Sequence, residues 1–185
     1  MKHSKLAELT DKIGSGLATI YKELLKDYQD KPITFLEIGV WKGGSMLLFE
    51  ELLPAAKIYG IDILDRPEVL KDSKVITRVI DQNDTGALVA LAEEAGGFDF
   101  IIDDGTHFKK ETENSFYTLW KYLNSGGKYI IEDWAVGLIA SKAGPYSGID
   151  DLIYKITSEK VSLGISEMRI VVKKDMCSYA LFGKR

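Results

Sequence analysis

The chain has 185 residues, of which 45% are hydrophobic and 28% are charged, values typical of one globular domain. Its 24 basic and 28 acidic residues give a net charge of −4, which argues against a nucleic-acid partner because phosphate neutralisation needs a basic surface. No apolar run is long enough to span a membrane, the N-terminus lacks the apolar stretch of a signal peptide, and the single Cys177 excludes a disulfide framework. We therefore expect one cytoplasmic domain over residues 1–185, with an N-terminal helical segment at 1–30 and an α/β core at 33–185.

Hydrophobic spacing predicts the order of helices and strands. Apolar residues at three- and four-residue intervals predict helix over the first 30 residues, with Gly14 and Gly16 allowing a break near Ser15. Nearly unbroken apolar runs predict buried strands at 33–39, 57–62, 74–80, 98–103 and 128–132. Helices are predicted between and after them, at 46–53, 84–95, 109–123 and 149–159. Two final runs, 168–172 and 178–182, predict an antiparallel hairpin with its turn at 173–175.

This alternation predicts an α/β fold with a doubly wound, mostly parallel, seven-stranded sheet and an antiparallel C-terminal hairpin. In such sheets, ligands bind beyond the carboxyl ends of the strands. Polar residues follow each of the first five predicted strands: a glycine turn at 39–45, then Asp62, Asp81-Gln82, Asp103-Asp104 and Glu132-Asp133. Any one of these could be a loop residue or a helix cap, as we expect for Asp84, but five in succession indicate a site.

The glycine turn lets a ligand approach the backbone closely, and the helix that follows offers free N–H groups. Asp62, 23 residues after Gly39, is placed to accept hydrogen bonds from a ribose diol. Trp41 stands where a dinucleotide fingerprint requires its second glycine, and Glu37 adds a carboxylate that suits a cationic cofactor. These residues disfavour nicotinamide binding, whereas a glycine turn used only for helix packing is the alternative.

The pattern Glu37-x-Gly39-x-x-x-Gly43-Gly44-Ser45 with Asp62 resembles the cofactor site of class I methyltransferases, which have a Rossmann-like fold. The resemblance implies that S-adenosylmethionine is the cofactor. It further implies that the glycine turn lines the methionine part, that Asp62 binds the ribose, and that Asp81 and Gln82 meet the adenine. The cofactor-binding set implied in this way is Glu37, Gly39, Gly43, Ser45, Asp62, Asp81, Gln82 and Asp103.

A narrower resemblance covers about residues 9 to 133. The segments that carry it are 9–15 (LTDKIGS), 35–40 (FLEIGV), 58–62 (IYGID), 101–107 (IIDDGTH) and 129–133 (YIIED). They are similar to the macrolide-sugar O-methyltransferases, the mycinamicin and macrocin group, and the cephalosporin hydroxylase-like proteins share much of the pattern. The ordered Asp-Asp-Gly-Thr-His and Glu-Asp motifs are its most specific part.

A metal site is expected at Asp104, Glu132 and Asp133, which form an all-oxygen cluster suited to Mg²⁺ if the fourth and fifth strands are neighbours. The alternative is that Asp104 caps a helix while the other two begin a loop; the resemblance favours the metal. His107 lies three residues beyond Asp104, and the resemblance implies that it is the general base. Imidazole exchanges protons near neutral pH, although a lone histidine with a structural role is the alternative.

The expected activity is S-adenosylmethionine-dependent, Mg²⁺-dependent O-methylation of a hydroxyl on a sugar or glycosylated small molecule. Trp41, Trp134 and Tyr146 either stack against this acceptor or serve in packing. The similarity becomes weaker after Asp133, and we expect no additional N-terminal domain of the kind seen in a larger relative. The N-terminal segment and the loop at 134–148 are thus left to form the acceptor site, completed in one alternative by another subunit of a homo-oligomer. Two other functions stay open: a hydroxylase-like oxidoreductase on the same scaffold, and a non-catalytic module that binds the cofactor or a sugar.

Overall fold

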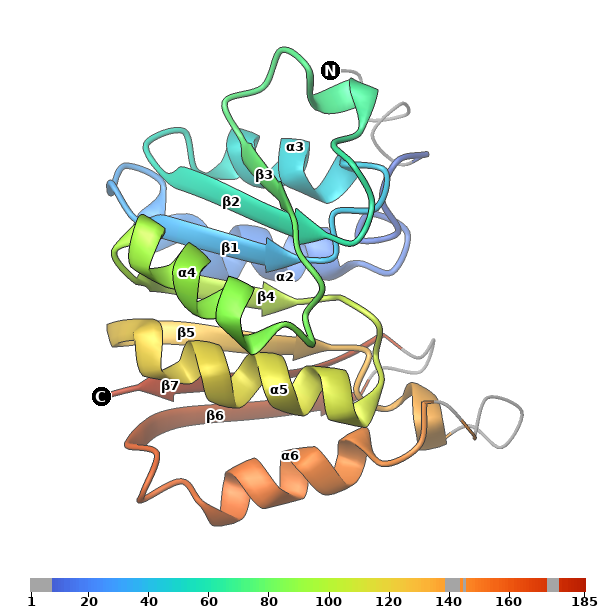
Figure 1. Cartoon of the computed structure of the whole chain (residues 1–185), viewed down its shortest axis with the longest axis vertical. Helices are drawn as coiled ribbons and strands as arrows, with labels where there is room; N and C mark the ends of the chain where they lie inside the picture. Colours follow the sequence, from blue (N-terminus) through green and yellow to red (C-terminus); the bar gives the residue numbers. More distant parts are fainter. Residues whose placement is uncertain (1–7, 139–143, 145, 173–176) are drawn as a thin grey trace.

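The computed structural model describes residues 8–138, 144, 146–172 and 177–185, which surround one central sheet (Figure 1). The seven strands lie in the order β3-β2-β1-β4-β5-β7-β6. Neighbours from β3 to β5 are parallel, whereas β7 is antiparallel to both β5 and β6. The predicted sheet with its antiparallel C-terminal hairpin is confirmed. The strands are β1 (Thr34–Ile38), β2 (Lys57–Asp62), β3 (Ile76–Val79), β4 (Phe98–Asp103), β5 (Leu123–Glu132), β6 (Ile165–Val172) and β7 (Ser178–Lys184).

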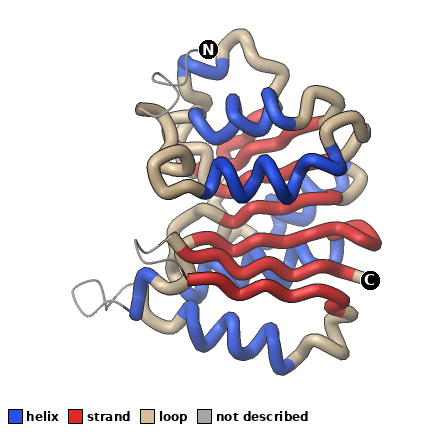
Figure 2. Tube along the Cα trace, turned by 180° about the vertical axis from the view of Figure 1, so that it is seen from behind, coloured by secondary structure: helices blue, strands red, loops and turns tan. Residues whose placement is uncertain are grey.

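Helices cover both faces of the sheet. One apolar cluster joins the strands to α4 (Thr85–Ala95), α5 (Lys109–Leu119) and α6 (Ile149–Ser158). A second cluster joins the opposite face to α2 (Leu17–Leu25) and α3 (Gly44–Leu52), which lie over one half of that face in Figure 2. Short 3₁₀ turns occur at Lys26–Tyr28, Glu68–Leu70, Trp120–Tyr122 and Val136–Leu138. No helix in the described part of the chain is long and apolar enough to cross a membrane.

The N-terminal segment departs from the predicted helix. Helix α2 begins only at Leu17, after Gly16 with φ 80°, so the predicted break near Ser15 is confirmed, but residues 8–16 form turns and bends. These turns fold back on the helix, because the amide of Ala18 donates to the carbonyl of Lys12. Residues 1–7 and the expected hairpin turn at 173–175 lie outside the described residues.

The alternation of side chains along the strands decides which acidic residues share a face. Glu37 on β1 follows Phe35 by two positions, and Glu132 on β5 follows Ile130 by two, so both point to the face packed by α2 and α3. Asp103 follows Ile101 by two positions and points to the face packed by α4 and α5. The sheet therefore separates Asp103 from Glu37 and Glu132.

Candidate active site

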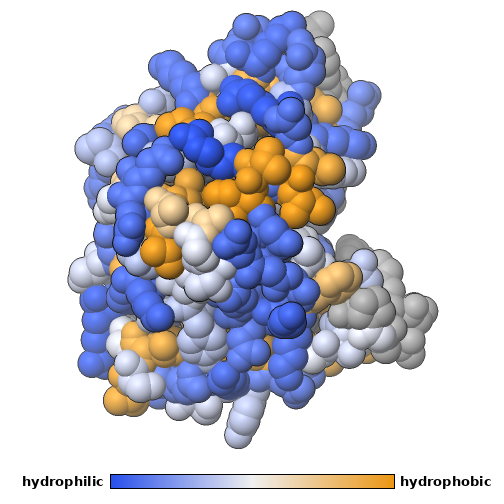
Figure 3. Space-filling model, viewed as in Figure 1, coloured by the Kyte–Doolittle hydropathy of each residue, from blue (hydrophilic) through white to orange (hydrophobic). Residues whose placement is uncertain are grey.

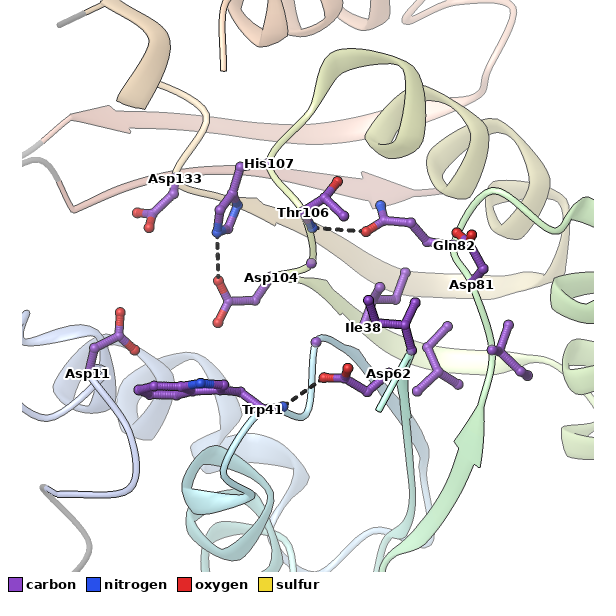
Figure 4. A pocket seen from close by; sticks show the side chains of 15 residues that line it. Asp11, Ile38, Trp41, Asp62, Asp81, Gln82, Asp104, Thr106, His107 and Asp133 are labelled. Carbon is purple, nitrogen blue, oxygen red and sulfur yellow. Dashed lines mark hydrogen bonds and ion pairs between the residues drawn. The ribbon is translucent and has the colours of Figure 1, made fainter. Parts of the chain in front are cut away.

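A pocket with a volume of about 430 Å³ opens beyond the carboxyl ends of the parallel strands (Figure 4). One part is walled by isoleucines, with the carboxylates of Asp62 and Asp81 beside them. The other part is polar and holds Asp104, His107 and Asp133. Its described lining residues are Asp11, Ile38, Gly39, Trp41, Ile61, Asp62, Ile63, Ile80, Asp81, Gln82, Asp104, Gly105, Thr106, His107 and Asp133. Five of them are aspartates and none is lysine or arginine, so the pocket is strongly acidic.

The turn after β1 brings two chain segments into close contact. Gly39 has φ 95°, and a Cβ atom there would overlap the backbone carbonyl of Asp104. Gly44, at the start of α3, lies against the backbone of Leu9, 2.5 Å from where its Cβ would be. The glycines therefore let β1, the loop after β4 and the N-terminal segment meet at one side of the pocket.

Asp62 ends β2 and holds the turn at Trp41. Its carboxylate accepts hydrogen bonds from the amide of Trp41 at 2.8 Å and from the amide of Leu64 at 2.9 Å. Each carboxylate oxygen has a further lone pair, so Asp62 can still accept a hydrogen bond from a ligand hydroxyl. The Trp41 ring is 57% exposed, with the Lys42 ammonium 4.3 Å from its centroid.

Gln82 supports the loop that carries His107. Its side-chain oxygen accepts a hydrogen bond from the amide of Thr106 at 2.9 Å, and its backbone oxygen accepts one from the side chain of Asn114. The Gln82 side chain also fills the space where a Cβ atom of Gly105 would lie. Gln82, which the sequence predicts to contact the adenine, thus lines the pocket and also stabilises the loop that carries His107.

Asp104, His107 and Asp133 form a compact group of potential metal ligands. One ligand atom from each residue lies within 4.8 Å of the others, and His107 Nε2 is 3.7 Å from Asp104 Oδ1. His107 and Asp133 have φ values of 55° and 52°, and Trp41 has 45°; among the described residues these are the non-glycine positions with positive φ. Such conformations are costly for non-glycine residues and tend to cluster at functional sites. All three of these residues line the pocket.

The structure places Glu132 on the inner side of this group rather than within it. Its Oε1 accepts hydrogen bonds from Lys12 Nζ at 2.8 Å and from the Tyr21 hydroxyl at 2.6 Å. Lys12 Nζ also donates to Asp104 Oδ2 at 2.5 Å and lies 3.6 Å from Glu37 Oε1. The Lys12 side chain is 0% exposed, so one ammonium is buried among three carboxylates.

Burial shifts the ionisation of these groups. Burial raises the pKa of Glu132 to about 8 and that of Glu37 to about 7; Asp104 adds to both shifts and Lys12 opposes both. Burial, followed by the negative charges of Asp104 and Asp11, also raises the pKa of Asp133, against the effect of His107. The pKa of Lys12 lies well above its ordinary value, because Asp104, Glu132 and Glu37 together outweigh its desolvation. Lys12 is therefore the cation that offsets this buried negative charge.

The described pocket wall contains four residues of the predicted cofactor set, Gly39, Asp62, Asp81 and Gln82, but not Glu37, Gly43, Ser45 or Asp103. Glu37 is fully buried and accepts a hydrogen bond from Ser45 Oγ at 2.7 Å. Asp103 is buried on the other face, where it accepts hydrogen bonds from the hydroxyls of Ser115 and Tyr129. Lys12 and Tyr21 are the contacts that sequence reasoning missed, although Lys12 stands in one of the segments that carry the family resemblance.

Exposed aliphatic side chains gather near the ends of β2 and β3, and one of them, Ile63, lines the pocket. Ile63, Leu64 and Val79 are 60–64% exposed at the ends of β2 and β3, and a hydrophobic area is visible over this region in Figure 3. Phe108 directly follows His107 in the chain, and its ring centroid lies 5.4 Å from that of Tyr146. Trp134 packs against the core cluster beside α4 to α6, which fits the packing alternative for this residue.

Known proteins similar to this chain are methyltransferases, in agreement with the resemblance seen in the sequence motifs. The methyltransferase domain family matches residues 36–134. Demethylmacrocin O-methyltransferase of Streptomyces fradiae is 36% identical over 134 residues, which cover 68% of this chain and 34% of that protein. Mycinamicin VI 2''-O-methyltransferase of Micromonospora griseorubida is 37% identical over 120 residues, covering 61% and 30%.

Among solved structures, the MycE methyltransferase from the mycinamycin biosynthetic pathway, in complex with Mg, SAH and mycinamycin VI, superimposes with a TM-score of 0.73 at 26% identity. The match covers 90% of this chain and 49% of that one. The chain thus spans about a third of the curated relatives it matches and about half of this structure. Since the family match spans more than half of its residues, and the fold and the motifs agree with it, the chain belongs to the methyltransferase domain family.

Proposed function

We propose that this chain is an S-adenosylmethionine-dependent O-methyltransferase that acts on a hydroxyl of a sugar or glycosylated small molecule, with Mg²⁺ in the polar part of its pocket. The observation that carries the proposal is that one pocket has two adjoining parts. One part has an apolar wall with the carboxylate of Asp62, and the other holds Asp104, His107 and Asp133. The demethylmacrocin and mycinamicin relatives are named for O-methyl transfer, and the MycE complex holds Mg and SAH, which supports the same assignment here. In this proposal residues 1–185 act as one domain.

The described residues of the pocket fit both S-adenosylmethionine and Mg²⁺. An adenosine suits the wall of Ile61, Ile63 and Ile80, with Asp62 in reach of a ribose hydroxyl, and a sulfonium is favoured by a wall that carries five aspartates. Asp104 and Asp133 would hold the metal, because their carboxylates lie close together in an acidic pocket and hard oxygen ligands suit Mg²⁺. When bound, S-adenosylmethionine supplies an electrophilic methyl group and Mg²⁺ supplies positive charge beside the acceptor oxygen.

Residues of the protein would accept the proton of the acceptor hydroxyl and position the reactants. His107 accepts the proton of the acceptor hydroxyl on an imidazole nitrogen, and the nearby Asp104 stabilises the imidazolium that results. Gln82 holds the Thr106 amide and so fixes the loop in which His107 stands. Phe108 and Tyr146 offer an aromatic surface beside this loop for the acceptor. Much of the rate would come from holding the acceptor hydroxyl, His107 and the methyl donor in line.

The proposal predicts that His107→Asn binds the cofactor product but does not transfer methyl groups. Asparagine tolerates the positive φ at this position better than alanine, so the substitution removes the imidazole with little backbone strain. Calorimetry with S-adenosylhomocysteine should give dissociation constants for variant and wild type within about threefold, while turnover falls by at least about 100-fold. The assay is transfer of a labelled methyl group to glycosylated compounds with free sugar hydroxyls.

Three results would count against parts of the proposal. A fully active His107→Asn variant would remove His107 from the chemistry while leaving the methyltransferase assignment intact. A folded wild-type protein, free of copurified cofactor, that binds no S-adenosylhomocysteine would overturn the assignment itself. Binding without transfer to any acceptor would favour the non-catalytic binding module instead.

A further inference from the structure

Three carboxylates, those of Asp104, Glu132 and Glu37, share the ammonium of Lys12, which is not among the described residues that line the pocket. Lys12 comes from the N-terminal segment, yet its Nζ donates to Asp104 Oδ2 at 2.5 Å and to Glu132 Oε1 at 2.8 Å. These partners are 92 and 120 residues away in the sequence. The ammonium has three N–H donors. The third carboxylate in reach is that of Glu37, whose Oε1 lies 3.6 Å from Lys12 Nζ and has no hydrogen-bond partner in the described part of the chain.

The two oxygens of Asp104 have different neighbours. Oδ2 faces inward and accepts from Lys12, whereas Oδ1 lies 3.7 Å from His107 Nε2 on the pocket side. The Asp104 side chain is 20% exposed and that of Lys12 is 0% exposed, so the contact joins a residue of the pocket wall to the buried interior. The contact with Lys12 thus fixes the rotation of the carboxylate, and thereby the oxygen that Asp104 presents to His107 and Asp133.

The same contact holds the N-terminal segment in place. The backbone of this segment touches the glycine turn at Leu9 and Gly44, and its Asp11 lines the pocket. Tyr21 on α2 donates to the Glu132 oxygen that also accepts from Lys12, which adds a second link from this part of the chain to β5. Lys12 is therefore placed to bind the segment to the carboxylates beneath the pocket.

We propose that Lys12 is a positioning residue, which holds Asp104 in the orientation that completes the Asp104–His107–Asp133 group and fixes the N-terminal segment against it. The part of this inference that concerns a cation rests on the metal site of the proposed function. Residues that orient metal ligands by hydrogen bonding typically change metal affinity by about 10–100-fold when they are removed. Lys12 has this relation to Asp104, although its charge has the same sign as that of the metal.

The test compares Lys12→Met, which keeps the length of the side chain without its charge, with Lys22→Met, the same change at an exposed lysine of α2. Mn²⁺ serves as the probe, and its binding to the whole chain is measured by electron paramagnetic resonance. Lys12→Met should weaken Mn²⁺ binding at least about tenfold, whereas Lys22→Met should match the wild type. Tighter Mn²⁺ binding in Lys12→Met would overturn the proposal, because it would show that Lys12 competes with the cation instead of preparing its site.

Hydrogen–deuterium exchange gives a readout that needs no metal. In Lys12→Met, amides of residues 8–16 and 104–108 should exchange at least about tenfold faster than in wild type, while peptides from β1 keep their protection and report an intact fold. Unchanged exchange in both segments would contradict the positioning role. A wild type that binds no Mn²⁺ would refute the metal site of the proposed function, and the exchange result would still decide the role of Lys12.

Lys12→Met leaves three carboxylates, two of them buried, without their cation and could fail to fold. The second variant, Lys12→Met with Glu132→Gln, removes one of these carboxylates along with the ammonium. Its segment 8–16 should also lose protection relative to Glu132→Gln alone. Equal protection in these two variants would show that Lys12 does not fix the segment.

Discussion

At the scale of single residues, the alternation of side chains on a strand separates neighbouring aspartates. Asp103 is buried between Ser115 and Tyr129, while Asp104, the next residue, faces Lys12 and His107. The sequence places both at the end of β4 and so predicts their general location. Because side chains alternate along a strand, Asp103 points to the opposite face of the sheet from Glu37. The prediction that placed both residues in the cofactor site did not take this alternation into account.

The burial of Asp103 predicts a pH dependence of stability. Burial raises the pKa of its carboxyl from 3.8 to about 6, against the hydrogen bonds from Ser115 and Tyr129. Between about pH 4 and 6 the folded state keeps this proton while the unfolded state loses it, so the free energy of unfolding falls as the pH rises, by about 3 kcal/mol from this group. Asp103→Asn should therefore show a smaller decline over this range than wild type, in urea unfolding at fixed pH values.

Asp72→Asn provides the control for this experiment, because Asp72 is exposed. Its pH dependence should follow that of the wild type. If Asp103→Asn and wild type lose the same free energy between pH 4 and 6, the carboxyl of Asp103 is not protonated in the folded state over this range. Glu37 and Glu132, with pKa values of about 7 and about 8, extend the decline of the wild type to higher pH.

At the scale of elements, the apolar runs predict the strands well. The predicted bounds of β2 and β4 match those observed, and Asp84 caps α4 as predicted by accepting a hydrogen bond from the amide of Ala87. The extra length of β5, which begins at Leu123 and not at 128, was not predicted because Gly126 and Gly127 interrupt the apolar pattern there. The helix predicted over 8–16 is wrong, since the contacts of Lys12 with distant carboxylates favour a turn that local spacing does not encode.

The turn after β1 predicts a difference between two glycine substitutions. Gly39 and Gly126 have φ values of 95° and 77°, but a Cβ atom at Gly39 would overlap Asp104, whereas one at Gly126 would meet no atom of the described residues within 4 Å. Gly126→Ala should lose about 1–2 kcal/mol of unfolding free energy from backbone strain alone. Gly39→Ala should lose about 1–3 kcal/mol more, because the overlap forces β1 and β4 apart.

Urea unfolding of the two variants measures this difference directly. Equal losses would mean that the close approach of Gly39 to Asp104 contributes nothing to stability. The larger loss at Gly39 would show that the turn after β1 and the loop after β4 are packed as one unit, as the pocket requires.

At the scale of the whole molecule, the charge distribution determines which ligands the pocket favours. The chain carries a net charge of only −4, yet five aspartates line the pocket and none of its described lining residues is lysine or arginine. The sequence predicts four of these aspartates, because Asp62, Asp81, Asp104 and Asp133 follow strands. Asp11 was missed, since its place in the wall depends on how the N-terminal segment folds back.

This charge predicts a preference between two cofactor analogues. Sinefungin has an amine where S-adenosylhomocysteine has a neutral sulfur, and one added positive charge in an acidic pocket should gain about 1 kcal/mol, or about fivefold in affinity. Calorimetry in EDTA at low ionic strength should show this gain, and 1 M salt should reduce it because exposed charges are then screened within about 3 Å. Equal affinities at low salt would mean that the aspartates do not act on the reacting centre.

The contact between Lys12 and Glu132 also orders events in time while the chain is being made. The two residues are 120 positions apart, so at about 5–20 residues per second Glu132 is synthesised about 6–24 s after Lys12. Until β4 and β5 exist, the ammonium lacks Asp104 and Glu132, the two carboxylates to which it donates hydrogen bonds. The segment that carries Lys12 is thus synthesised before its partners but reaches its final place only after them, and the candidate site is assembled only after strand pairing.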